Sequence, residues 1–243
     1  MAMKRISTFV ILLLFGYPLM AQYTFSGLRI GLGFYSMKSL DNLQELRRKE
    51  SGLPLKTTES YPSTLNYHLE VGRYQPFFIS KLGISYGYSS TGARSTISDY
   101  SGRYDLDAII SSHQLGFTLE HDFTRGNNWG YGTYIEAGAA YSQLNTLDFF
   151  NLTFPTQITY KTAYDFNSFG GYSELGLFFH HKYSFLMARL NLGYLVDFMA
   201  GLHLKDNKDM QLYIDNKKVR PQWDGLRAGL QLNLLLIKPK KTN

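Results

Sequence analysis

The chain contains no cysteine in its 243 residues. This absence excludes disulfide bonds as a source of stability and thiolate chemistry as a mechanism. Beyond its N-terminal segment the chain also lacks any run of eighteen or more consecutive apolar residues, which is the length that a transmembrane helix needs. The sequence therefore argues against a secreted fold stabilised by disulfide bonds, against an enzyme that uses a thiol, and against a helical membrane protein.

The N-terminal segment has the pattern of a secretory signal peptide. Lys4 and Arg5 supply a positive charge, and the apolar run over residues 6–15 is too short to span a bilayer. Ala21 offers a small residue for cleavage. We expect residues 1–21 to be removed as a signal peptide, residues 22–237 to form one domain, and residues 238–243 to form a basic periplasmic tail.

The charge balance is mild, whereas the aromatic and glycine contents are high. Losing the two positive charges of Lys4 and Arg5 lowers the formal net charge from +6 to +4, which is ordinary surface charge and predicts no nucleic-acid partner. The chain has 19 Tyr, 17 Phe and 22 Gly. Many aromatics and glycines without long apolar runs are typical of amphipathic β-strands.

The segment before the basic tail alternates with a period of two. The period of two is that of a β-strand, in which successive side chains point to opposite faces. One face carries only apolar residues: Leu226, Ala228, Leu230, Leu232, Leu234 and Leu236. The other face carries Arg227, Gly229, Gln231, Asn233 and Leu235.

Seven earlier segments alternate in the same way. They are residues 25–37, 64–73, 78–88, 109–123, 129–142, 168–180 and 184–197. The connections are alternately long and short, and the long ones are residues 38–63, 89–107, 143–167 and 199–222, although residues 158–160 suggest that strands continue beyond the main sheet. Up-and-down pairing would place the short turns at one end and the long loops at the other, as in outer-membrane barrels. The predicted fold is all-β: an eight-stranded antiparallel up-and-down transmembrane β-barrel with short periplasmic turns and long extracellular loops.

Local signals are also present inside the long connections. Asp41 and Gln44 have the spacing of a helix capping box, and Gly52 with Pro54 would end such a helix. In the last connection, Asp215–Asn216 could form the tip of a small hairpin.

Each predicted strand contributes one strong charge to the face opposite its apolar face. A barrel of eight strands is just wide enough to be filled by side chains, and a buried unpaired charge costs several kcal/mol, so we expect these charges to form a salt-bridged plug. A proton path, an ion path or a catalytic carboxylate pair is the alternative. In strand order the charges are Arg29, Glu70, Lys81, Glu120, Glu136, Glu174, Arg189 and Arg227.

His68 lies two residues before Glu70 on the same predicted face. No second histidine lies at ligand spacing on that face, so a hydrogen-bonded interior residue is favoured over a metal ligand. We expect no metal and no cofactor.

From Phe25 to Ile237, this arrangement of strands and connections resembles the small eight-stranded bacterial outer-membrane barrels, such as the transmembrane domain of outer membrane protein A and outer membrane protein X. The resemblance lies in the architecture and includes no sequence motif. It implies adhesion, membrane integrity, defence or partner binding, usually without transport. The chain departs from such barrels by ending on Leu236–Ile237 and a Lys/Pro tail, where they typically end on an aromatic residue.

Three functions are compatible with such a barrel. The first is a non-enzymatic barrel in the bacterial outer membrane, with periplasmic termini, that displays loops for binding or serves as a subunit of a complex. Its partners would be outer-membrane lipid, lipopolysaccharide or other outer-membrane proteins. Arg and Tyr are favoured at binding hot spots, and the loop candidates are Arg94, Tyr100, Arg103 and Tyr104.

The second function is a lipid-modifying enzyme, an acyl hydrolase or acyltransferase. Some barrels of this type carry a Ser/His/carboxylate set on the lipid-facing rim, and here Ser111, His113 and Asp107 are the corresponding residues. The third function is a narrow pore. The sequence favours the first function, with no catalytic residue.

Overall fold

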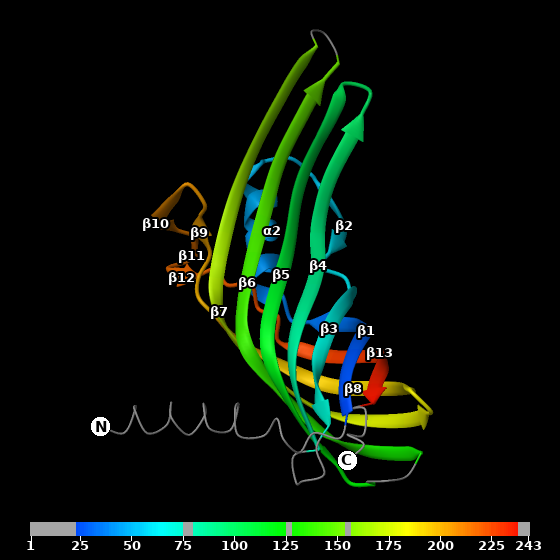
Figure 1. Ribbon diagram of the computed structural model, residues 1–243. Coiled ribbons are helices and arrows are strands. Elements are labelled where there is room, and N and C mark those ends of the chain that lie inside the picture. The colour runs from blue at the N-terminus through cyan, green and yellow to red at the C-terminus, as the bar shows by residue number, and fades with distance from the viewer. Residues whose placement is uncertain (1–22, 75–79, 125–127, 154–156, 238–243) are drawn as a thin grey trace, which may run out of the picture.

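The computed structural model describes residues 23–74, 80–124, 128–153 and 157–237. Eight long strands follow one another along the chain, each antiparallel to both of its neighbours. The last of them pairs with the first, so the eight form a ring (Figure 1). The strands are β1 (Tyr23–Tyr35), β3 (Thr64–Tyr74), β4 (Lys81–Asp99), β5 (Gly102–Asp122), β6 (Trp129–Leu152), β7 (Ile158–Tyr183), β8 (Leu186–Met199) and β13 (Gly225–Ile237).

The alternation predicted from the sequence is confirmed in the ring. Leu230 is 68% exposed, whereas the next residue, Gln231, is 4% exposed. On the outer surface Leu28 lies opposite Leu232, and Ile30 lies opposite Leu230. The ring is therefore apolar outside and polar inside. Among the described residues, no helix is both long enough and apolar enough to cross a membrane.

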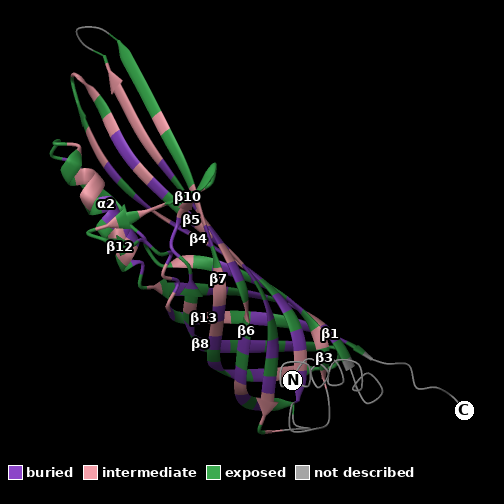
Figure 2. Cartoon of the chain, turned by 90° about the vertical axis from the view of Figure 1, so that its left-hand side faces the viewer, coloured by how far each residue is buried: buried purple, intermediate pink, exposed green. Residues whose placement is uncertain are grey.

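Four of the strands continue well beyond the ring. β6 has 24 residues and β7 has 26, whereas β1 and β13 have 13 each. The distal parts of β4 to β7 form a sheet that projects from one end (Figures 1 and 2), and the short strand β2 (Lys56–Ser60) pairs with the distal part of β4. We call residues 89–112, 142–152 and 158–168 the projecting sheet; they are the distal parts of these strands together with the β4–β5 turn.

The projecting sheet corrects the prediction that residues 89–107 and 143–167 are connections, and it confirms the continuation of strands suggested at residues 158–160, where β7 begins. β4 and β5 are joined by a turn at Tyr100–Ser101, and strand pairing continues to that turn. The alternation was hidden because the outer face becomes polar there while the inner face carries small residues. Ala93 and Ala108, for example, are buried and Arg94 is exposed.

The first long connection contains α2 (Lys38–Glu50), which packs on the inner face of the projecting sheet. The predicted capping box is wrong: the helix begins after Met37, which has a left-handed backbone (φ 40°) and no side-chain cap. Gln44 instead donates a hydrogen bond from its Nε2 to the carbonyl of Leu106 at 2.9 Å. Leu40 and Leu43 are buried against the sheet. The predicted end is confirmed, with Gly52 at φ 66°.

Short strands complete the same end of the molecule. The predicted tip at Asp215–Asn216 is confirmed, since both residues have positive φ (48° and 60°) between β11 and β12. The segment 200–222, which contains β9 to β12, and α2 form a cap over the mouth of the ring with one apolar cluster. The short strands are β2 (Lys56–Ser60), β9 (His203–Leu204), β10 (Asn207–Gln211), β11 (Tyr213–Ile214) and β12 (Lys217–Lys218).

Two large aromatic residues, one near each end of the ring, are buried. Trp223 lies in the cap, where its Nε1 donates to Ser142 Oγ at 2.9 Å. Phe25 lies four residues before Arg29, so both side chains are on the same face of β1 and point inward. Phe25 packs with Met187 and Leu235 at the opposite end of the ring. The polar interior thus lies between two apolar clusters. The expected turn at residues 74–77 falls largely outside the described residues.

Candidate functional site: the charged interior

The structure places all eight charged residues singled out above inside the ring, one from each strand. Their exposed fractions are between 0 and 8%. They fall into two groups along the axis of the ring, and each group contains two cations and two carboxylates.

The first group lies toward the short turns and is centred on Lys81. This fully buried ammonium group donates to Glu70 Oε2 at 2.7 Å and to Glu120 Oε1 at 2.6 Å. Arg189 Nη1 donates to both oxygens of Glu120 at 2.7 and 2.8 Å. The Lys81 Nζ also lies 4.4 Å from the centre of the Phe25 ring, so a cation–π contact closes the group at that end.

The second group lies toward the cap and is centred on Glu174. Its carboxylate accepts from Arg29 Nη1 at 3.3 Å and from Arg227 Nη1 at 3.1 Å. Tyr134 donates to the same carboxylate at 2.5 Å. Glu136 accepts from Tyr172 at 2.6 Å and lies 3.6 Å from Arg29 Nη2. Each of the four carboxylates in the two groups therefore has a cationic partner.

His68 lies between the two arginines of the second group. Its Nδ1 is 3.0 Å from Arg29 Nη2, and its Nε2 is 3.2 Å from Arg227 Nη1. A neutral imidazole has only one acceptor nitrogen, so the two guanidinium groups compete for it. This arrangement fits the hydrogen-bonded interior residue predicted from the sequence. In the part of the chain that the structure describes, no cluster of His, Asp and Glu is arranged to hold a metal ion.

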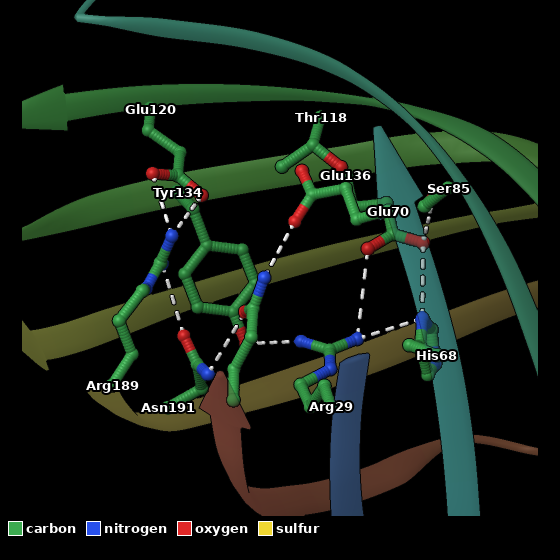
Figure 3. Close-up of a pocket in the computed structure, with 11 residues that line it drawn as sticks. Arg29, His68, Glu70, Ser85, Thr118, Glu120, Tyr134, Glu136, Arg189 and Asn191 are labelled. Atoms are coloured by element: carbon green, nitrogen blue, oxygen red, sulfur yellow. Dashed lines mark hydrogen bonds and ion pairs between the residues drawn. The ribbon is translucent and has the colours of Figure 1, made fainter. Parts of the chain in front are cut away.

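Little space remains between these side chains (Figure 3). The interior cavity bordered by Arg29, His68, Glu120 and Glu136 has a volume of about 10 Å³. A single water molecule needs about 10–15 Å³ on this measure. The interior is therefore filled at this level, and the cavity has room for about one water.

Sequence reasoning missed the neutral polar residues that complete the network. Gln231 Nε2 donates to Glu70 Oε2 at 2.9 Å, Gln114 Oε1 accepts from Arg227 at 3.0 Å, and Ser85 donates to Glu136 at 2.7 Å. Each lies an even number of residues from the interior charge on its own strand, and therefore on the same face. That spacing is the signal that could have identified them.

The alternative catalytic set lies on the outer face of β5. Asp107 accepts two hydrogen bonds from Arg94, both at 2.7 Å, and His113 Nδ1 lies 2.8 Å from the Tyr86 hydroxyl. Within the described ranges, no hydrogen bond joins Ser111 to His113. The three residues thus share a face, Asp107 and His113 have other partners, and the catalytic role of the set stays a prediction.

The four loop candidates for binding belong to the β4–β5 hairpin of the projecting sheet. Arg94 is engaged by Asp107, and Arg103 lies 2.7 Å from Asp105. Tyr104 packs edge-on against Phe150, with ring centres 5.9 Å apart. Tyr100, in the turn, is 92% exposed. The turn residue is therefore the most accessible of the four.

Comparisons with known proteins add little to this description. No protein-family model matches the chain, and no curated protein matches its sequence. Two solved structures of Ail, the attachment invasion locus protein of Yersinia pestis, are similar to it, each at 11% identity and a TM-score of 0.32. One covers 89% of this chain and 97% of its own; the other, in complex with the heparin analogue sucrose octasulfate, covers 87% and 96%. These values are too low to carry an argument about function.

Proposed function

We propose that this protein is a non-enzymatic integral β-barrel of the bacterial outer membrane that displays its projecting sheet and cap for binding. The eight-stranded ring crosses the membrane as a closed up-and-down barrel. Its interior is a salt-bridged plug, and its outer face meets lipid.

The inverted distribution of polarity carries this proposal. Leu69, Leu115, Leu175 and Leu230 are each more than half exposed, on four different strands, while the inward-pointing charges of the same strands inside the ring, Glu70, Glu120, Glu174 and Arg227, are buried. Soluble monomers rarely expose contiguous apolar patches larger than a few hundred Å². A belt of leucine around a charged interior is the arrangement that a lipid environment stabilises.

The asymmetry of the two ends supports an orientation. Short connections join β5 to β6 and β7 to β8, whereas the projecting sheet and the cap lie at the other end. In outer-membrane barrels the short turns face the periplasm. Residues 23 and 237 pair with each other at the short-turn end, so both ends of the domain would be periplasmic.

The filled interior favours a binding role over a pore. A cavity of about 10 Å³ between the charge groups offers no path for a solute. The projecting sheet, by contrast, presents a strand edge: within the described chain, residues 158–164 of β7 pair only with β6. Ile158, Tyr160 and Tyr164 are more than half exposed there. Such an edge can take up an extended segment of a partner protein.

Gel migration and cell-surface labelling test this proposal together. The protein should migrate differently before and after boiling in a detergent gel, because a folded barrel resists unfolding by the detergent. Since the chain has no cysteine, single variants can be labelled with an impermeant maleimide. Tyr100→Cys should react on intact cells, whereas Asn128→Cys, in the β5–β6 turn, should react only after the outer membrane is permeabilised.

Identical migration of boiled and unboiled protein would argue against a barrel. If Asn128→Cys but not Tyr100→Cys is labelled on intact cells, the barrel has the opposite orientation in the membrane. Discrete openings in planar-bilayer recordings would favour the pore, and release of acyl chains from lipid A by the purified protein would favour the enzyme.

A further inference from the structure

A cationic pocket opens at the rim of the ring, between the first turn of α2 and the β11–β12 hairpin. Its volume is about 550 Å³. Four exposed cations line it, Lys38, Lys217, Lys218 and Arg220, against one carboxylate, that of Asp215. Over the described ranges, none of the four cations forms an ion pair.

Side chains, rather than the end of the helix, supply the positive charge of this pocket. The backbone N–H of Ser39, in the first turn of α2, already donates to Gln222 Oε1 at 2.6 Å. Four unpaired cations around one concavity repel one another. A ligand that carries more than one negative charge would relieve this repulsion and would accept charge-assisted hydrogen bonds.

An aromatic groove lies on the adjoining outer surface, with a volume of about 430 Å³. Phe34, Tyr194 and Leu226 line it, and each is about half exposed. Leu226 is the register partner of both Phe34 and Tyr194, so the groove lies across β1, β13 and β8. It is continuous with the apolar belt of the ring. Its one carboxylate, that of Asp224, already accepts from the backbone N–H of Asp197 at 2.7 Å.

One short stretch of chain separates the pocket from the groove. Ser36 lines the groove and Lys38, two residues later, lines the pocket. Two residues of extended chain span about 7 Å. The stretch is held in place because Ser36 N donates to Asp224 O at 2.9 Å. A molecule with a charged head and an apolar chain can therefore reach both sites.

We propose that this rim binds a lipid of the outer leaflet that carries a phosphorylated headgroup. The headgroup phosphates lie in the cationic pocket, and an acyl chain lies in the aromatic groove. The inference rests on the proposed function, since it requires the apolar belt to face a bilayer. Charge complementarity selects a phosphorylated lipid, and continuity with the belt selects a lipid over a free anion.

Lipid retention on the purified protein tests the inference. Native mass spectrometry would follow the binding of lipid A with two phosphates to the protein in detergent. The double variant Lys217→Gln/Lys218→Gln should weaken binding by about tenfold, because it removes two charge-assisted contacts. The matched control, Lys56→Gln/Lys161→Gln, makes the same change in charge at two exposed lysines of β2 and β7 and should bind like the wild type.

A second pair of variants tests the groove without changing the charge. Ser63→Trp would fill the groove, which Ser63 lines, and should also weaken binding. Ser98→Trp, at an exposed position of β4 in the projecting sheet, should not. Dephosphorylated lipid A should bind the wild type about as weakly as intact lipid A binds the double lysine variant.

Three results would overturn the inference. The first is that Lys217→Gln/Lys218→Gln binds lipid A as tightly as the wild type does, and the second is that both double lysine variants lose the same amount of affinity. The third is full displacement of the lipid by millimolar inorganic phosphate, which would indicate a free-anion site. Gel migration separates this failure from failure of the proposed function. If the protein shows heat-dependent migration but its affinity for lipid A does not depend on Lys217 and Lys218, the lipid site is contradicted and the proposed barrel is not.

Discussion

Lys81→Met is expected to lower the free energy of unfolding by about 3–5 kcal/mol, because it removes one partner from a buried ion-pair group. Lys81 is fully buried and bonds to two carboxylates. Arg189 still neutralises Glu120 in the variant, but Glu70 keeps only a neutral donor, Gln231. The measurement is urea unfolding of the protein in lipid bilayers, followed by the gel shift between folded and unfolded forms.

A double variant distinguishes the cost of leaving a buried carboxylate without a cation from the cost of lost packing. In Lys81→Met/Glu70→Gln the carboxylate left without a cation is also neutralised. The double variant should therefore be more stable than Lys81→Met alone, although it carries an additional change. Additive losses would show that the two side chains act independently, and a silent Lys81→Met would contradict the charged plug.

Leu230→Arg is expected to cost about 2–4 kcal/mol in a bilayer, the range for a cation on the lipid face near the midplane of a barrel. Leu230 is 68% exposed and lies near the middle of β13. In water, a substitution at so exposed a position would usually change stability by less than about 0.5 kcal/mol. Unfolding of the variant in bilayers measures the difference.

Tyr160→Arg is the matched control. Tyr160 is 61% exposed, but it lies on β7 in the projecting sheet, which would be in water. We expect this variant to unfold with nearly wild-type stability. Equal costs at the two positions would mean that the outer face of the ring does not meet lipid.

The strands of the ring and the direction of their side chains could be predicted from the sequence, because lipid and plug impose opposite polarities on alternate residues. Arg227 illustrates this: a charge between apolar neighbours in β13 has no place on the outer face, and it lies 3.1 Å from Glu174 inside. The pairing of individual charges could not be predicted, because it depends on the stagger of the strands around the ring. Lys81, for example, bonds to carboxylates from both neighbouring strands.

Apart from the strand signal at residues 158–160, the projecting sheet and the cap could not be predicted from the same pattern. Beyond the ring the outer face becomes polar, so the contrast between the faces fades even though strand pairing continues. Trp223 shows the consequence for a single residue. It lies just before β13, where the cap covers it and Ser142 accepts its indole N–H. The lipid site at the rim depends on the same cap, and no sequence motif marks it.

Fluorescence quenching by lipid tests the central claim most directly. Single cysteines at Leu230, Leu192, Tyr160 and Tyr164, all about half exposed or more, would carry an environment-sensitive fluorophore in bilayers that contain a spin-labelled lipid. A barrel that meets lipid with its outer face predicts strong quenching at Leu230 and Leu192 and little at Tyr160 and Tyr164. Equal quenching at all four positions, or none at Leu230 and Leu192, would contradict the account.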